Sequence, residues 1–341
     1  MLTPRRDGYY NLSRGTGGLT ASPSTYLSLG DHIPRMDVLV AGGTGFIGTN
    51  LCAELAERGH RVTALSRSPD DGDLPPGVEA AMGDVGAYDS IVDTVAGRDA
   101  VVNLVSLSPL YQPRGDKSHE EVHLGGTENL VRAAEEGGVD RFLQLSGLGA
   151  DPDGDTAFIR AKGKAEAVVR SADLDWTIVR PSVVFGDGGE FVEFTKTLTT
   201  PYVTGLPGGG KTRFQPIWVG DLVPMLADAL EDDAHVGEIY ELAGPQILTL
   251  ADVTELAYAA EGKDVTIVPI PMGLAKLGLS AIDSVPGVPF GADQARSLEF
   301  DNTVADNDIT AFGHEPAALT TLGEYLGFEG RRSHERAKGT A

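Results

Sequence analysis

The chain has a single cysteine, Cys52, among its 341 residues, so no disulfide can form within it. Cys52 lies in an expected helix, where we expect it to serve as a small buried apolar side chain. The scarcity of cysteine indicates a reducing compartment. No run of 18 apolar residues occurs, so we expect no transmembrane helix. These absences predict a cytoplasmic protein and leave open whether it attaches peripherally to a membrane.

Basic residues are also scarce, because 27 lysines and arginines stand against 50 acidic residues and give a net charge of −23. Such a polyanionic surface disfavours nucleic acid and anionic membranes, since like charges repel. We interpret the excess of carboxylates as adaptation to high salt and expect a halophilic protein. The 41 % apolar content suffices for a full core, and the length suits about two domains.

The two ends of the chain differ from the rest in composition. Residues 1–35 are rich in Gly, Ser, Thr and Tyr and lack an apolar signal core, so we expect a disordered extension. Met36 offers a second translation start, which leaves open whether residues 1–35 are translated. Residues 328–341 are expected to form a charged, frayed tail.

Three spaced glycines follow a short apolar run that begins at Asp37. Gly42 permits a tight turn, Gly45 lets a pyrophosphate approach bare backbone, and Gly48 lets the next helix pack close to the strand. A glycine triplet alone is weak evidence and needs a strand–helix–strand unit of about 30 residues around it. Residues 61–66 supply the returning strand, so the segment predicts a dinucleotide-phosphate cradle.

Strand-like and helix-like segments alternate from residue 37 to residue 181. Such alternation predicts an α/β fold, a Rossmann-type doubly wound parallel sheet, with a small, mainly helical C-terminal lobe. We expect residues 36–181 to form the NAD(P)-binding Rossmann core. Residues 182–327 are expected to hold the remaining Rossmann strands, interleaved with a substrate or lid lobe.

Several motifs in order resemble the extended and atypical short-chain dehydrogenase/reductases, the NAD-dependent epimerase/dehydratase-like proteins. Within that superfamily the chain looks most like the branch with the NAD(P)H-binding accessory subunit of respiratory complex I. This resemblance implies a nicotinamide dinucleotide, a small-molecule substrate that stays unidentified, and a partner in a membrane complex. The motifs occupy residues 42–48, 83–85, 102–106, 126–130, 180–186, 285–294 and 300–302.

Cofactor choice depends on the end of the second strand, where an acid would bind a ribose 2′-hydroxyl and repel a 2′-phosphate. Here Ser66 and Arg67 stand instead, which favours NADP(H), with NAD(H) left open. The resemblance implies that Asp84 and Val85 meet the adenine, although Asp84 also suits a strand-end cap. The expected cofactor-binding residues are Gly42, Thr44, Gly45, Phe46, Ile47, Gly48, Ser66, Arg67, Asp84, Val85, Val105, Ser106, Lys162, Pro181 and Val184.

The family's hydride chemistry uses a tyrosine four residues before a lysine. The matching positions hold Phe158 and Lys162, so the usual acid/base group is missing while the ribose-binding lysine remains. The family's catalytic serine or threonine position holds Leu148. Ser146 is a weak substitute, because a serine of ordinary pKa is a poor acid and a strand-end hydrogen bond suits it better.

Two further motifs match patterns of other enzyme classes. His119 and His123 form an H-E-x-x-H sequence, which on a helix would offer two imidazoles to zinc, but the segment leads into a sheet-packing helix. Residues 205–212 match the nucleotide triphosphate loop, which requires a following helix, whereas residues 213–219 favour a strand. We therefore expect no metal and interpret residues 205–212 as a connection over the substrate cleft.

The sequence leaves three functions open. The first is an NAD(P)(H)-binding protein of this family, acting as an unconventional oxidoreductase if it is an enzyme. The second is a non-catalytic nucleotide-binding subunit of a respiratory or membrane-associated complex. The third is a sugar-nucleotide epimerase or dehydratase, which Phe158 disfavours because that chemistry also uses the tyrosine.

Overall fold

The computed structural model describes residues 34–69, 74–110, 117–271, 273 and 292–328. The elements below belong to one compact unit that begins at Arg35. The expected extension and charged tail lie outside the described residues except at Pro34, Arg35 and Phe328. Residues 285–291 of the family-like C-terminal motif also lie outside them. No helix in the described part is both long and apolar enough to cross a membrane.

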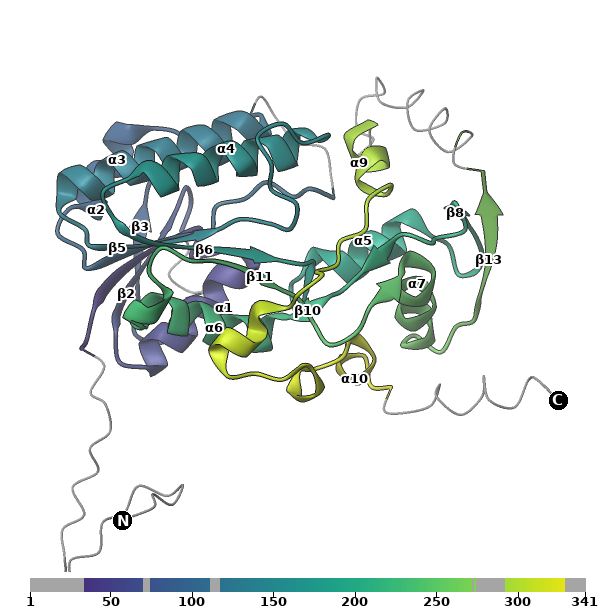
Figure 1. Ribbon diagram of the computed structural model, residues 1–341. Coiled ribbons are helices and arrows are strands. Elements are labelled where there is room, and N and C mark those ends of the chain that lie inside the picture. Colours follow the sequence, from purple (N-terminus) through teal and green to yellow (C-terminus); the bar gives the residue numbers. More distant parts are fainter. Residues whose placement is uncertain (1–33, 70–73, 111–116, 272, 274–291, 329–341) are drawn as a thin grey trace, which may run out of the picture. The chain divides into compact units, whose positions relative to one another are not determined.

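A seven-stranded sheet in the order β11-β6-β5-β4-β1-β2-β3 forms the centre of this unit, with every strand parallel to its neighbours (Figure 1). This order confirms the doubly wound Rossmann prediction. The central strands β1, β4 and β5 are almost entirely buried, as expected for strands with both faces covered, whereas the edge strands β3 and β11 are largely half-buried. Their bounds are β1 Asp37–Ala41, β2 Arg61–Ser66, β3 Val78–Met82, β4 Ala100–Asn103, β5 Arg141–Leu145, β6 Asp175–Pro181 and β11 Ile239–Leu242.

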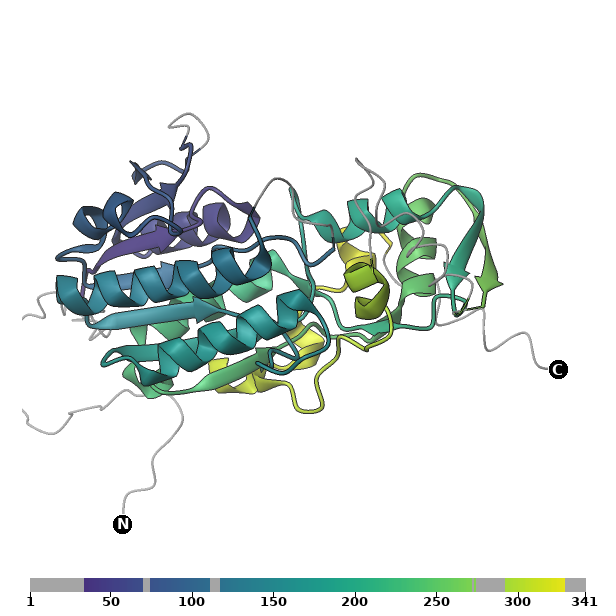
Figure 2. The ribbon, with the colours of Figure 1, turned by 90° about the horizontal axis from the view of Figure 1, so that it is seen from above.

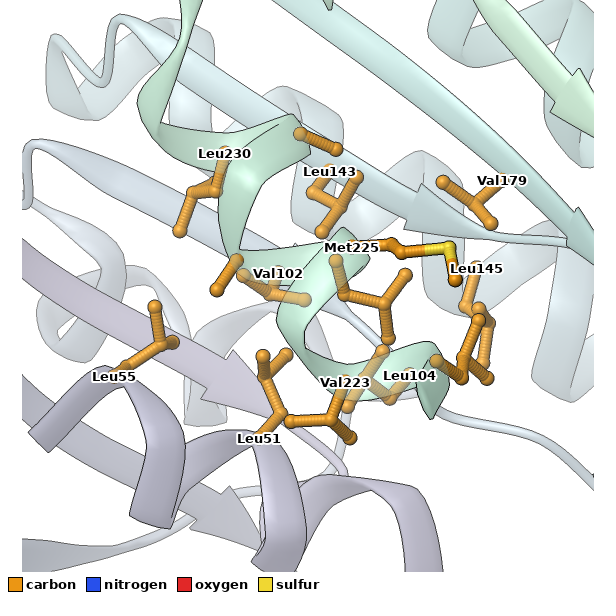
Figure 3. Close-up of a cluster of buried hydrophobic side chains, with 14 of the residues drawn as sticks. Leu51, Leu55, Val102, Leu104, Leu143, Leu145, Val179, Val223, Met225 and Leu230 are labelled. Carbon is orange, nitrogen blue, oxygen red and sulfur yellow. The ribbon is translucent and has the colours of Figure 1, made fainter. Parts of the chain in front are cut away.

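Helices cover both faces of the sheet (Figures 1 and 2). On one face, α1 (Phe46–Glu57) packs against α6 (Val219–Glu231) over a core that includes Leu51, Val102 and Met225 (Figure 3). On the other face, a second core lies beneath α2, α3 and α4, which span Val92–Val95, Gly126–Gly137 and Ala157–Ser171.

Two helical segments are irregular. Residues 88–95 form a 3-10 turn, Tyr88–Ser90, followed by the four-residue α2. The segment before α3 is a π-helix, Glu120–Gly125, which continues directly into α3. Gly126 follows the π-turn, and a Cβ there would lie 2.7 Å from Val85 Cγ2, so the glycine allows close packing.

The second lobe combines helices with short strand pairs. Helices α5 (Glu190–Leu198), α7 (Leu250–Ala259) and α9 (Ala292–Ser297) accompany β8 (Tyr202–Pro207), which pairs with β13 (Val265–Ile270). Residues 205–212 lead into the short strand β9 (Arg213–Phe214), which pairs with β12 (Leu248–Thr249). No helix follows that loop, so the nucleotide triphosphate loop is excluded.

The small strands β7 (Val184–Phe185) and β10 (Ile217–Trp218) pair with each other, and α10 is Leu322–Tyr325. The 3-10 turns are Asp233–His235, Asp308–Phe312 and Pro316–Ala318.

Asn302 joins the lobe to the end of the sheet. Its side-chain oxygen accepts hydrogen bonds from Ser182 Oγ at 2.7 Å and from the Val183 backbone N–H at 3.0 Å. Its backbone forms a bridge to Phe214, and the preceding Asp301 pairs with Arg213 at 2.7 Å. The motif at residues 300–302 therefore fixes the chain that leaves β6 against the lobe.

Candidate functional site

The glycine turn between β1 and α1 has room for glycine alone at Gly42, Gly43 and Gly48. Gly42 has a φ of +82°, and a Cβ there would lie 3.1 Å from the Val105 backbone nitrogen at the end of β4. A Cβ on Gly48 would lie 2.1 Å from the Gly42 carbonyl oxygen, which no real contact allows. The turn therefore brings α1 as close to the sheet as backbone atoms permit.

The N-terminus of α1 is open to an anion. Gly45 is the N-cap, no side chain caps the helix, and its first turn has no acid. The first N–H groups of a helix have no partner within it and carry a partial positive charge. Thr44 and Gly45 are exposed, and the ring of Phe46 packs against the turn at Gly186 and Gly189. Ile47 is half-buried and packs against the core beneath α1.

At the end of β2, Ser66 Oγ is buried without a hydrogen-bond partner in the described part of the chain, and Arg67 is exposed beside it. Asp84, after β3, accepts the backbone N–H of Gly86 at 3.0 Å and forms an ion pair with Lys117. The bond from Lys117 holds the pKa of the Asp84 carboxyl below its usual range, and the charge of Arg67 acts in the same direction. Two cations thus flank this acid, although the whole chain is strongly anionic.

The end of β4 is organised by Asn103, which is buried and binds three neighbours. Its amide nitrogen donates to Thr127 Oγ1 at 3.1 Å and to Gln144 Oε1 at 2.9 Å, and its oxygen accepts the Val105 N–H at 3.2 Å. Val105 is half-buried and Ser106 is exposed at the same edge. Val85 instead has a buried side chain, and its carbonyl accepts Asn129 Nδ2 at 2.7 Å.

Lys162 on α4 reaches the end of β5. It is 2 % exposed, and its Nζ donates to the Leu145 carbonyl at 3.0 Å. Burial lowers the pKa of this ammonium group to about 8. The next residue, Ser146, has a buried hydroxyl without a partner in the described residues, and Leu148 is buried. The lysine therefore binds the residue that directly precedes Ser146, while Leu148 supplies no polar group.

Phe158 is surrounded by groups that the sequence alone did not place. Its ring lies 5.7 Å from the ring of His119 and 5.3 Å from that of His123, both edge-on, and 5.8 Å from Lys162 Nζ. The two imidazoles stack 5.4 Å apart. His123 Nε2 accepts the Leu107 N–H at 3.4 Å, so its proton belongs on Nδ1, which has no partner among the described residues.

The imidazole pair is uncharged at neutral pH. Burial lowers the pKa of His119, and it lowers that of His123 to about 2, with the charge of Lys162 adding to the effect. The described residues contain no group of three or more His, Cys, Asp or Glu side chains that could hold a metal. The H-E-x-x-H segment thus packs its two imidazoles against Phe158.

The segments that close the site come from the later part of the chain. Asp293 on α9 accepts the Ala157 N–H at 3.1 Å and so caps the first turn of α4 beside Phe158. Pro181 is buried, and its carbonyl accepts the Leu148 N–H at 3.2 Å. Val184 is half-buried in β7. Sequence reasoning missed Asn103, Lys117, the imidazole pair as neighbours of Phe158, and Asp293.

The residues present fit a dinucleotide. The glycine cradle has no space for a Cβ at Gly43 or Gly48, and the uncapped helix start suits a pyrophosphate. The hydroxyls of Ser66 and Ser146 have no hydrogen-bond partner among the described residues and lie at the ends of β2 and β5, where two riboses would lie. An ammonium group has three donors, and the structure gives Lys162 one acceptor among the described residues, which suits ribose hydroxyls.

Comparisons with known proteins agree with this geometry. Residues 42–201 match the NAD(P)H-binding family model. The chain is 31 % identical to the NADH dehydrogenase [ubiquinone] 1 alpha subcomplex subunit 9 of Arabidopsis thaliana, over 87 % of this chain and 75 % of that protein. It is 29 % identical to the NADH-ubiquinone oxidoreductase 40 kDa subunit of Neurospora crassa, over 86 % and 78 % of the two chains.

The fold also matches solved structures. One is a nucleoside-diphosphate-sugar epimerase from Staphylococcus aureus, with a TM-score of 0.65 and 19 % identity, over 85 % of this chain and 99 % of that one. At this identity the likeness concerns the fold alone. It agrees with the Rossmann-type fold of this chain.

Proposed function

We propose that this chain, which belongs to the atypical short-chain dehydrogenase/reductases, binds NADP(H) without catalysing the hydride transfer that is usual in the family. Subunit 9 of the mitochondrial NADH dehydrogenase alpha subcomplex is among its relatives. NAD(P)H binding is the property of the family. The preference for the phosphorylated form and the absence of ordinary turnover are our proposals for this chain.

Phe158 is the observation that carries the proposal. It occupies the tyrosine position four residues before Lys162, and its ring contacts two uncharged imidazoles. A phenyl ring has no proton to donate, so hydride transfer at this site would lack the family's acid/base group. Lys162 would still bind the nicotinamide ribose, so the loss of catalysis does not remove nucleotide binding.

The preference for NADP(H) is supported by the groups at the end of β2. Arg67 is exposed there, and Ser66 carries no charge that would repel a 2′-phosphate. Asp84, the acid that follows β3, is neutralised by its ion pair with Lys117. A guanidinium group binds a phosphate through charge-assisted hydrogen bonds, which are stronger than neutral ones.

Direct analysis of the nucleotide content tests the proposal. Protein purified without added cofactor is denatured, and the released nucleotides are identified by mass. We expect a nicotinamide dinucleotide, mostly NADP(H), and saturable binding when NADPH fluorescence is titrated. No nucleotide in the preparation, together with no binding at millimolar NADPH, would falsify the proposal.

A second candidate is an unconventional oxidoreductase in which water or the substrate supplies the proton. Lys162 and the orphaned Ser146 hydroxyl favour it, because they place a buried cation and a free hydroxyl at the end of β5. The variant Phe158→Tyr restores the phenol. New reductase or epimerase activity in this variant would mean that the wild type lacks only the proton donor. If no activity appears, the pocket itself is unsuited to either reaction.

We further propose that the chain takes part in a respiratory or membrane-associated assembly. The support is the likeness to a named subunit of mitochondrial NADH dehydrogenase over most of both chains. Tagged protein should co-purify with membrane complexes solubilised in mild detergent. Recovery of the whole population as a free monomer that reduces a defined substrate would argue for the enzyme instead.

A further inference from the structure

Lys162 is a buried cation with little negative charge around it to compensate for its own. It is 2 % exposed and donates to one backbone carbonyl, that of Leu145. The acid whose charge acts on it, Glu166, is bound through both carboxylate oxygens to Arg180 at 2.8 and 2.7 Å. The Glu166 carboxylate therefore interacts mainly with Arg180 rather than with Lys162.

The other groups around Lys162 are neutral. Phe158 replaces a phenol that could ionise, and the stacked His119 and His123 are uncharged at neutral pH because they are buried. Ser146 adds a neutral hydroxyl next to the carbonyl that Lys162 binds. Asp293, whose charge acts on His119, accepts a backbone N–H at the start of α4. Among the described residues around Lys162, the two carboxylates are thus both engaged, Glu166 in its pair with Arg180 and Asp293 with the Ala157 N–H and with Arg296.

The two redox forms of the cofactor differ in charge at this end. The oxidised nicotinamide ring is a cation, the reduced ring is neutral, and the phosphates are the same in both. Because charges interact strongly where water is excluded, a cationic ring near Lys162 would be repelled. We infer that the site selects the reduced dinucleotide over the oxidised one, with Lys162 as the discriminating residue. This inference rests on the proposed cofactor site and adds a preference for redox state.

The experiment measures dissociation constants for NADPH and NADP⁺ at pH 7, and its readout is the ratio of the two. We expect NADP⁺ to bind at least about tenfold more weakly than NADPH. Repulsion between two like charges several ångströms apart in a partly buried site has this order of magnitude. In Lys162→Met both affinities fall because ribose contacts are lost. The ratio should nevertheless approach one, because the repelling charge is gone.

Lys164 provides the matched control. It lies two residues further along the same helix, points to the surface and pairs with Glu120 at 2.7 Å. Lys164→Met removes the same charge from the chain, so its ratio should equal that of the wild type. An equal effect of both substitutions would assign the preference to the overall charge and overturn the role of Lys162.

A second measurement needs no variant. Lys162 loses its proton near pH 8, so NADP⁺ binding should strengthen relative to NADPH binding as pH rises from 7 to 9. The imidazoles of His119 and His123, which face it, are already neutral in this range, and Glu166 is held in its ion pair with Arg180.

The outcomes separate this inference from the proposed function. Equal affinities for the two forms at pH 7 would overturn the redox preference while leaving dinucleotide binding intact. A ratio that persists unchanged in Lys162→Met, or that is insensitive to pH, would also overturn it. Failure of the wild type to bind either form would remove the cofactor site itself.

Discussion

At the scale of single residues, Gly48 places the strongest steric demand on the candidate site. The variant Gly48→Ala puts a Cβ 2.1 Å from the Gly42 carbonyl, so the turn or α1 must shift. We expect a loss of about 1–3 kcal/mol in unfolding free energy, as for other overpacked sites, and NADPH binding should weaken more than tenfold. Chemical denaturation and fluorescence titration measure the two effects.

Gly125→Ala is the control for that substitution. Gly125 has a φ of −60°, and no atom would lie within 4 Å of a Cβ there. Its stability should equal or exceed that of the wild type, with unchanged NADPH affinity. A similar loss in both variants would mean that any added methyl group near these helices is harmful.

Arg67 is expected to set the preference between the two dinucleotides. Arg67→Gln removes a charged partner of the 2′-phosphate, which is worth about 1.5–3 kcal/mol, and should weaken NADPH binding at least tenfold with little effect on NADH. Arg132→Gln is the control, because Arg132 is an exposed arginine paired with Glu136 on α3. Equal losses for NADPH and NADH in the Arg67 variant would disprove the assignment.

Lys162 should lower the stability of the protein when no nucleotide is bound. Its pKa falls from 10.5 to about 8 on folding, so at pH 7 the folded state holds a desolvated charge. Lys162→Met should stabilise the nucleotide-free protein at pH 7 by about 3 kcal/mol at most. The unfolded state binds more protons between pH 8 and 10.5, so wild-type stability rises there and the advantage of the variant shrinks. Denaturation across this pH range provides the check.

At the scale of elements, local sequence patterns predicted the strands around the glycine turn well. Residues 61–66 were expected as a strand and form β2 with the same bounds. The helix expected after the strand begins within the glycine motif itself, at Phe46. Periodicity is a local signal, so it identifies such elements when the chain follows one regular geometry.

The same signal failed where geometry changes within an element or where distant segments meet. The π-helix before α3 brings His119 and His123 to Phe158, which helical periodicity does not anticipate. The contacts of Asp293 and Asn302 join residues more than 100 positions apart. The cradle was therefore predictable from sequence, whereas the surroundings of Phe158 depend on tertiary packing.

The contact between α9 and α4 leads to a prediction at this scale. Asp293→Ala removes the acceptor of the Ala157 N–H, and losing such a capping group costs about 1 kcal/mol. Hydrogen exchange should accelerate at the first turn of α4, while β1 and β2 keep their protection. Unchanged exchange at residues 157–159 would show that Thr156, the N-cap, suffices to hold this turn.

At the scale of the whole molecule, the net charge of −23 dominates. Repulsion among surface carboxylates destabilises the compact state, and salt screens it, with a Debye length of about 3 Å at 1 M and 30 Å at 0.01 M. We expect the melting temperature to fall steadily as salt is lowered from molar to millimolar. Equal melting temperatures across that range would contradict adaptation to high salt.

The core beneath the glycine turn has a consequence for synthesis of the protein. Ile309 and Leu319 belong to the same buried cluster as Val38 and Leu51, although they lie some 270 residues downstream. A nascent chain can therefore not complete this cluster until almost all of the polypeptide has left the ribosome. The nucleotide-binding fold is therefore completed late in translation. Until then the incomplete sheet exposes apolar surface, so chaperone binding or rapid completion of folding is needed to avoid aggregation.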